Sequence, residues 1–103
     1  MKNDMIRRFG PLEIDLATYR VFLQGRLLAL PYKEYALLVY LSARVGKVVS
    51  KRELITQVCG RHDLGGVRKL DELIRHLRIQ IERSGVEFIR RVEDQGYEFL
   101  GAA

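Results

Sequence analysis

The sequence contains a single cysteine, so no disulfide framework can form within the chain, and a reducing compartment is expected. It also lacks a long hydrophobic run. The longest nearly apolar stretch, residues 35–41, is far too short to cross a bilayer, and the first eight residues lack the apolar core of a secretory signal. These absences predict a cytoplasmic protein that is not inserted in a membrane.

Catalytic and metal-binding patterns are missing as well. No Ser/His/Asp, Cys/His or paired-carboxylate arrangement stands at convergent positions, and no glycine-rich phosphate loop follows a strand. Candidate metal ligands by residue type are Cys59, His62, Asp63 and His76, but their spacing matches no standard zinc pattern. We therefore expect no enzyme, no cofactor, no metal site and no small-molecule substrate.

The chain is short and basic. Its 103 residues, 48% of them apolar, suffice for one domain with its own core over residues 1–103. The net charge of +5 favours a polyanionic partner but does not decide the fold. Residues 1–49 carry 8 basic and 4 acidic side chains, residues 50–84 carry 8 and 5, and residues 85–103 carry 2 and 4. The C-terminal segment is therefore net acidic.

The stretch from residue 67 to residue 83 has a clear helical period. At 100° per residue, the apolar stripe consists of Leu70, Leu73, Ile74, Leu77 and Ile81. The opposite face carries Arg68, Glu72, Arg75, His76, Ile79 and Arg83, with Lys69 and Arg78 on the flanks. This face suits a nucleic-acid groove, although a solvated basic face has the same pattern. Ile79 suits a thymine methyl, a second protein copy or plain exposure to solvent.

The first third of the chain reads as antiparallel strands, which we place at about residues 7–30. Apolar residues at 12, 14 and 16 alternate with acidic ones, as in a half-buried strand. Gln24-Gly25 predicts a tight reversal between two further strands. Such a small sheet needs helices to pack against.

Three helices and a hairpin are expected to follow. Pro31 predicts a buried helix over residues 31–44 that Gly46 ends. Ser50-x-x-Glu53 is a capping box for a helix over residues 50–59. The third helix spans residues 67–83, and residues 88–100 read as a β-hairpin. This order predicts an α+β fold, a winged helix-turn-helix with an N-terminal antiparallel sheet and a C-terminal wing.

The chain resembles the DNA-binding effector domain of OmpR/PhoB-type two-component response regulators from about Leu12 to Leu100. The matching residues are Asp15-x5-Val21-x3-Gly25-x4-Leu30, Glu34-Tyr35-x-Leu37-Leu38-x2-Leu41, Gly46-x-Val48-Val49-Ser50-x2-Glu53-Leu54, Arg68-x2-Asp71-x2-Ile74-Arg75-x-Leu77-Arg78 and Ile89-x2-Val92-x3-Gly96-Tyr97-x-Phe99. Together these motifs are highly specific. Regulators of this type carry a receiver domain ahead of the effector domain, for which 103 residues leave no room.

The resemblance implies a four-stranded N-terminal sheet, a third helix in the major groove of double-stranded DNA and a wing in the adjacent minor groove. It also implies RNA polymerase and a second copy on the DNA as partners. Arg68, Arg75 and Arg78 match family arginines, and Tyr97 matches a wing tyrosine near the DNA backbone. The outward face of the helix adds Lys69, Glu72 and His76 to the candidate DNA contacts. Lys51 and Arg52 begin the second helix and are candidates for phosphate contacts, or for a solvated first turn.

The chain departs from the family pattern at several positions. His76 replaces a frequent arginine, and a neutral imidazole cannot make the bidentate contact of arginine to guanine. Cys59 replaces a usual tryptophan, which removes an indole N–H. Glu93, Asp94 and Glu98 make the wing acidic. Either these carboxylates repel phosphates, or they pair with Arg90, Arg91 or a neighbouring copy.

Two functions follow from the sequence. The first is sequence-specific binding of double-stranded DNA as the output domain of a transcription regulator. The alternative is a winged-helix module for protein contacts through Ile79 and the acidic wing, with weak or lost DNA binding. Salt-sensitive binding to duplex DNA distinguishes them, because only the first predicts it.

Overall fold

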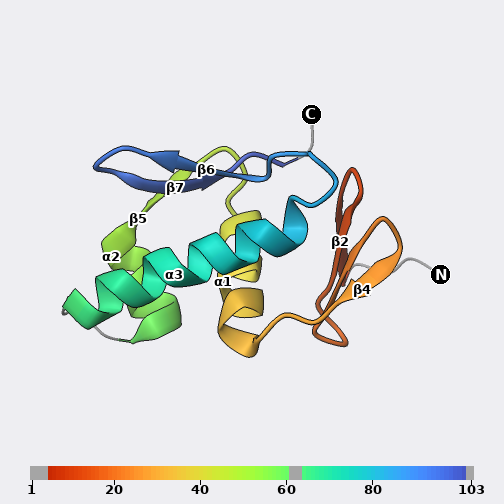
Figure 1. Ribbon diagram of the computed structural model, residues 1–103, viewed down its shortest axis with the longest axis horizontal. Helices are drawn as coiled ribbons and strands as arrows, with labels where there is room; N and C mark the ends of the chain where they lie inside the picture. Colours follow the sequence, from red (N-terminus) through yellow and green to blue (C-terminus); the bar gives the residue numbers. More distant parts are fainter. Residues whose placement is uncertain (1–4, 61–63, 102–103) are drawn as a thin grey trace.

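The computed structural model describes residues 5–60 and 64–101. Within these ranges the elements are, in chain order, β1 (Ile6–Phe9), β2 (Leu12–Asp15), β3 (Arg20–Leu23), β4 (Arg26–Leu28), α1 (Tyr32–Ser42), β5 (Val48–Ser50), α2 (Lys51–Leu54), the π-helical turn η1 (Ile55–Cys59), α3 (Leu64–Ile81), β6 (Ile89–Val92) and β7 (Gly96–Phe99). The molecule is elongated, with extents of 44 × 25 × 22 Å. The N-terminal sheet stands at one end, and β5, β6 and β7 lie beside α3 toward the other (Figure 1). This is the predicted winged helix-turn-helix.

The N-terminal sheet is an antiparallel meander in the order β1-β2-β3-β4. Its buried side chains alternate along β2 and β3, and they are Leu12, Ile14, Val21 and Leu23. Gln24 and Gly25 both have positive φ, 52° and 79°, which is the conformation of a two-residue hairpin turn and confirms the predicted reversal. The sequence pattern indicated β2, β3 and β4 but not β1, whereas the resemblance to the family correctly implied four strands.

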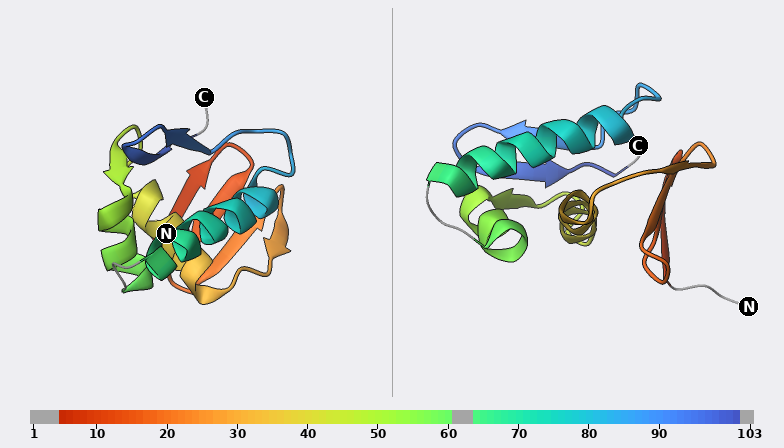
Figure 2. Two further views of the ribbon diagram at one scale, coloured as in Figure 1. Left: turned by 60° about the vertical axis from the view of Figure 1, so that its left-hand side comes forward. Right: turned by 60° about the horizontal axis from the view of Figure 1, so that its bottom comes forward.

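Helix α1 is the central helix of the fold, as predicted. It begins one residue after Pro31 and ends at Ser42, slightly inside the expected range. Its buried apolar residues are Tyr35, Leu37, Leu38 and Leu41. In the right-hand view of Figure 2, α1 lies between the N-terminal sheet and the rest of the domain. The apolar face of the sheet therefore packs against this helix.

The second helix contains a change of helical type that the sequence did not predict. Ser50 caps it as expected, because its Oγ accepts a hydrogen bond from the backbone N–H of Glu53 at 3.0 Å. The carboxylate of Glu53 does not complete the capping box, since it accepts a hydrogen bond from the hydroxyl of Tyr40. After Leu54 the helix widens into η1, where the N–H of Gly60 bonds to the carbonyl of Ile55 at 2.6 Å. Gly60, with φ 74°, ends it in the left-handed conformation.

Helix α3 is longer at its start than predicted. It begins at Leu64 and includes Gly65 and Gly66, whereas the predicted helix begins at residue 67. Glycine has a low helix propensity. Gly66 is buried one turn before Leu70, so packing of this turn against the core outweighs the low propensity. The helix ends at Ile81, before the predicted residue 83.

The wing belongs to a sheet of three strands, in the order β5-β7-β6. The hairpin of β6 and β7 is as predicted, but β5 was not, and it pairs with β7 through Val49 opposite Tyr97. Asp94 in the hairpin turn has φ 63°. Gly96 has φ 146°, and a Cβ there would lie 1.9 Å from the carbonyl oxygen of Val49. Only glycine permits this approach of β7 to β5.

One apolar core joins the two sheets and the helices. Its fully buried large side chains include Phe88, Phe99, Leu12, Leu38, Leu54, Leu70, Leu77 and Ile81. Phe88 and Phe99 stack with ring centroids 6.0 Å apart, which attaches the wing sheet to this core. Among the helices of the described ranges, none is long and apolar enough to span a membrane.

Candidate nucleic-acid interface

The outward face of α3 is exposed and largely basic. Arg68, Lys69, Glu72 and Arg75 are all exposed, as the helical period predicts. Within the described part of the chain, none of the three cations forms an ion pair. Ile79 lies among them with 54% of its surface exposed. These side chains can therefore meet a partner without first breaking an internal contact.

Asp71 connects α3 to two other elements. It accepts a hydrogen bond of 2.8 Å from the hydroxyl of Tyr97 in β7, and the Nζ of Lys51 in α2 lies 3.2 Å from the same oxygen. Tyr97 is only 4% exposed. Burial, followed by the hydrogen bond to Asp71 and the negative charge of Asp71, raises the pKa of Tyr97 to about 12. Two predicted DNA contacts, Lys51 and Tyr97, thus already have an internal partner.

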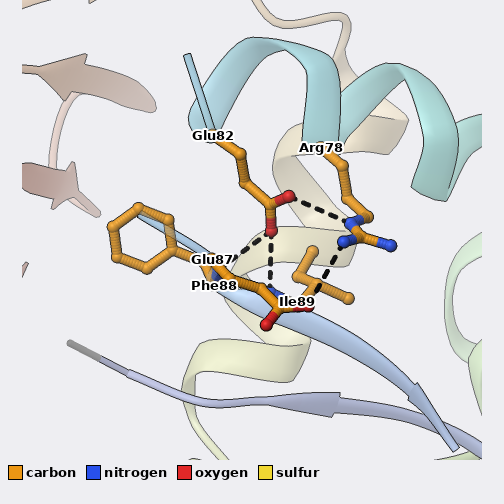
Figure 3. Close-up of polar contacts among 5 residues, drawn as sticks. All are labelled: Arg78, Glu82, Glu87, Phe88 and Ile89. Carbon is orange, nitrogen blue, oxygen red and sulfur yellow. Dashed lines mark hydrogen bonds and ion pairs between the residues drawn. The ribbon is translucent and has the colours of Figure 1, made fainter. Parts of the chain in front are cut away.

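Arg78 and Glu82 form a second connection between α3 and the wing (Figure 3). The Nε of Arg78 donates to Oε1 of Glu82 at 3.1 Å, and its Nη2 lies 3.4 Å from Oε2 of Glu87. Oε2 of Glu82 accepts hydrogen bonds from the backbone N–H groups of Phe88 at 2.8 Å and Ile89 at 3.1 Å. Glu82 therefore binds the helix side chain and the start of the wing at once.

His76 lies at the edge of the outward face and not at its centre. Its side chain is 46% exposed, and its Nδ1 is 3.9 Å from Oε2 of Glu34 in α1. Glu34 is 5% exposed. Burial raises the pKa of Glu34, while His76 and Lys69 lower it. His76 thus contacts α1 while about half of its side chain faces solvent. Its contact with a DNA base stays a prediction.

The acidity of the wing is partly neutralised within the wing itself. Arg90 Nη2 lies 2.6 Å from Oε1 of Glu98, so the pairing with Arg90 that was considered for these carboxylates is found for Glu98. Glu93 and Asp94, at the turn, are exposed and form no ion pair within the described residues, and Arg91 is exposed beside them. The tip of the wing therefore carries net negative charge, with the exposed Arg91 nearby.

A groove of about 480 Å³ separates the outward face of α3 from the wing. Its lining residues are Asp71, Ile74, Arg75, Arg78, Ile79, Glu82, Arg91 and Tyr97. The groove combines three guanidinium groups with apolar side chains, and its two carboxylates are engaged by the contacts described above. Such a lining suits a ligand that carries both negative charge and apolar groups.

The candidate metal ligands do not converge where the structure describes them. No three His, Cys, Asp or Glu side chains of residues 5–60 and 64–101 lie close enough to hold a metal ion. His62 and Asp63 lie outside the described residues.

The sequence matches the family described as transcriptional regulatory protein, C terminal, over residues 25–99. The chain belongs to this family. It is the family of OmpR/PhoB-type effector domains that the motifs indicated, and it consists of transcription regulators and not of enzymes.

The matches to known members of the family extend over most of this chain. Sensory transduction protein RegX3 of Mycobacterium leprae is 32% identical over 94 residues, which cover 91% of this chain and 48% of that protein. The chain thus spans about half the length of such a relative. The response regulator DrrB of Thermotoga maritima, an OmpR/PhoB homologue, superposes with a TM-score of 0.84 at 32% identity, covering 94% of this chain and 45% of that one.

A second solved structure is the DNA-binding domain of RstA from Klebsiella pneumoniae, in complex with the RstA box. It is 26% identical, has a TM-score of 0.79, and the match covers 92% of this chain and 96% of that one.

Asp71 and Glu82 hold candidate contact residues in place, and the sequence pattern did not indicate either role. They are eleven residues apart, which is about three helical turns, so they lie on the same flank of α3. The four-residue spacing of Arg78 and Glu82 is a usable signal for an ion pair. That this flank faces the wing depends on the tertiary fold, which the helical period does not contain.

Proposed function

We propose that this domain binds double-stranded DNA sequence-specifically as the output domain of a transcription regulator, with α3 in the major groove. The observation that carries the proposal is the row of exposed cations on α3, namely Arg68, Lys69 and Arg75, which form no ion pair among residues 5–60 and 64–101. An α-helix with such a face fits the width of the major groove, and its cations meet phosphates and base edges. The similar DNA-binding domain of RstA, which was solved in complex with the RstA box, supports the same assignment.

The proposed contacts divide by their position on the surface. We assign base readout to Arg75 and Glu72, since arginine pairs with guanine and a carboxylate accepts from cytosine. His76 is a further base contact, from the edge of the face. Arg68 and Lys69 are assigned to phosphates.

Four further residues complete the proposed interface. Arg52, exposed in the first turn of α2, adds a phosphate contact, and Lys51 beside it contributes while paired with Asp71. Arg78 faces the groove. We assign the hydroxyl of the buried Tyr97 to Asp71, so that this residue supports the interface from within.

The proposal also includes partners of the whole regulator. We propose RNA polymerase as a protein partner and a second copy of the domain as a neighbour on the DNA, in the cytoplasm. The family resemblance supports these partners.

The decisive experiment is a selection of bound sequences from a random duplex pool, followed by affinity measurements at several salt concentrations. We expect one enriched motif, with half-site spacing if two copies bind. Four phosphate contacts, from Arg68, Lys69, Lys51 and Arg52, correspond to a fall in affinity of about 3.6 log units per log unit of salt. No enrichment together with a flat salt response would refute DNA binding and favour the protein-contact module.

A further inference from the structure

Glu82 lies where α3 meets the first strand of the wing, and each of its carboxylate oxygens has a different task (Figure 3). Oε2 accepts hydrogen bonds from the backbone N–H groups of Phe88, just before β6, and of Ile89, the first residue of this edge strand. Oε1 accepts the Nε–H of Arg78 at 3.1 Å. With its side chain only 16% exposed, Glu82 is placed mainly for these internal contacts.

The contact to Glu82 determines how Arg78 is presented. The guanidinium group uses Nε for Glu82 and Nη2 for Glu87, and Nη1 has no partner among the residues that the structure describes. Arg78 lines the groove between α3 and the wing, together with Arg75 and Arg91. With α3 in the major groove as proposed, the groove between α3 and the wing is the place where its guanidinium groups can meet the DNA backbone.

We propose that Glu82 is a positioning residue for DNA binding, which holds Arg78 so that its free guanidinium edge meets a phosphate in this groove. The inference rests on the proposed function and specifies how one contact of that interface is made. A long, flexible arginine loses less side-chain entropy on binding when a carboxylate already holds it. Glu82 also ties the start of the wing to α3, so the two sides of the groove keep a fixed separation.

The sign of the effect distinguishes positioning from simple electrostatics. Removing a carboxylate near DNA should tighten binding if the carboxylate acts only through its negative charge. Removing a positioning carboxylate should weaken binding instead. The chain provides a matched control, because Glu87 also contacts Arg78 but is 55% exposed and accepts no hydrogen bond from the wing backbone within the described residues.

The test compares Glu82→Gln with Glu87→Gln in duplex affinity and its salt dependence. Glutamine at 82 keeps one oxygen for Phe88 and Ile89, but the NH2 group that replaces the other oxygen cannot accept a hydrogen bond from Arg78. We expect Glu82→Gln to bind about fivefold more weakly, with a salt slope lower by about 0.9 for one lost phosphate contact. Glu87→Gln should bind as tightly as wild type or more tightly. Arg78→Ala should add almost nothing in the Glu82→Gln background.

A second variant and a DNA-free measurement guard against misfolding. Arg78→Lys keeps the charge and leaves the contact of Glu82 to the wing intact, but it removes the Nε donor, so it should weaken binding like Glu82→Gln. NMR should show faster exchange of the Arg78 Nε proton with water in Glu82→Gln than in wild type.

The outcomes separate the two proposals. If wild type binds its selected duplex, and Glu82→Gln binds as tightly as Glu87→Gln while Arg78→Ala still weakens it further, the positioning role is refuted and DNA binding stands. If wild type binds no duplex, both proposals fail.

Discussion

Tyr97→Phe tests whether this tyrosine supports the interface from within or touches DNA. The substitution keeps the buried ring and removes only the hydroxyl, which donates to Asp71 at 2.8 Å. A hydrogen bond to a charged acceptor contributes about 1.5–3 kcal/mol. The carboxylate of Asp71 keeps Lys51 at 3.2 Å and is 45% exposed, so water can replace the phenol, and the loss should be near the lower end. We expect the free energy of unfolding to fall by about 1.5 kcal/mol, which lowers Tm by about 6–12 °C in a domain of this size.

The effect of Tyr97→Phe should depend on pH in a defined direction. Burial and Asp71 raise the pKa of Tyr97 to about 12, above the ordinary value of 10.0 for the unfolded chain. Because the folded state holds this proton more tightly, the stabilisation is fully present below pH 10 and is lost as the pH rises through 12. The difference in stability between wild type and Tyr97→Phe should therefore shrink above pH 10.

Urea unfolding followed by circular dichroism at about pH 7 and about pH 11 measures both differences. Tyr32→Phe is the control, because Tyr32 is 71% exposed and should change neither quantity by more than about 0.5 kcal/mol. Affinity for DNA should remain at the wild-type level in Tyr97→Phe. Full stability combined with weaker DNA binding would refute the internal assignment and make Tyr97 a direct contact.

Other predictions concern the helix, the wing tip and the sheet. Arg75→Ala should weaken binding to the selected duplex by about 1–3 kcal/mol and relax one base position, whereas Arg20→Ala in β3 should do neither; equal losses on all sequences would make Arg75 a phosphate contact. Glu93→Arg should tighten binding and steepen the salt slope by about one unit, and an unchanged slope in a folded variant would place the wing tip away from DNA. Gly96→Ala should lower the free energy of unfolding by more than about 2 kcal/mol, because its Cβ collides with the carbonyl of Val49, and a denaturation midpoint like that of wild type would contradict this.

Elements with a strong local pattern could be predicted from the sequence. The apolar stripe of α3, the cap at Ser50 and the turn at Gln24-Gly25 depend on neighbouring residues only, and each is found in the structure. The family motifs added the fourth strand of the N-terminal sheet.

The remaining features depend on contacts between distant residues. Strand β5 is three residues long and exists because it pairs with β7, so no alternation indicates it. The outward direction of Arg68 and Arg75 follows from the helical period. The four-residue spacing also indicates the pair of Arg78 with Glu82. The pairing of Lys51 with Asp71 and the contact of Glu82 to the wing backbone do not follow from the period, because they form only when α3 packs beside α2 and the wing.

The pairing of β5 with β7 has a consequence for the order of folding. The N-terminal sheet contains only hairpins between successive strands, whereas Val48 and Glu98 meet across nearly half of the chain. Closing so long a loop is entropically slow compared with forming a local hairpin. We therefore expect the β5–β7 pairing to form late, after α3 is helical. A nascent or partly unfolded chain then has the basic helix α3 without the wing beside it. Only the completely folded domain presents both sides of the groove to a ligand.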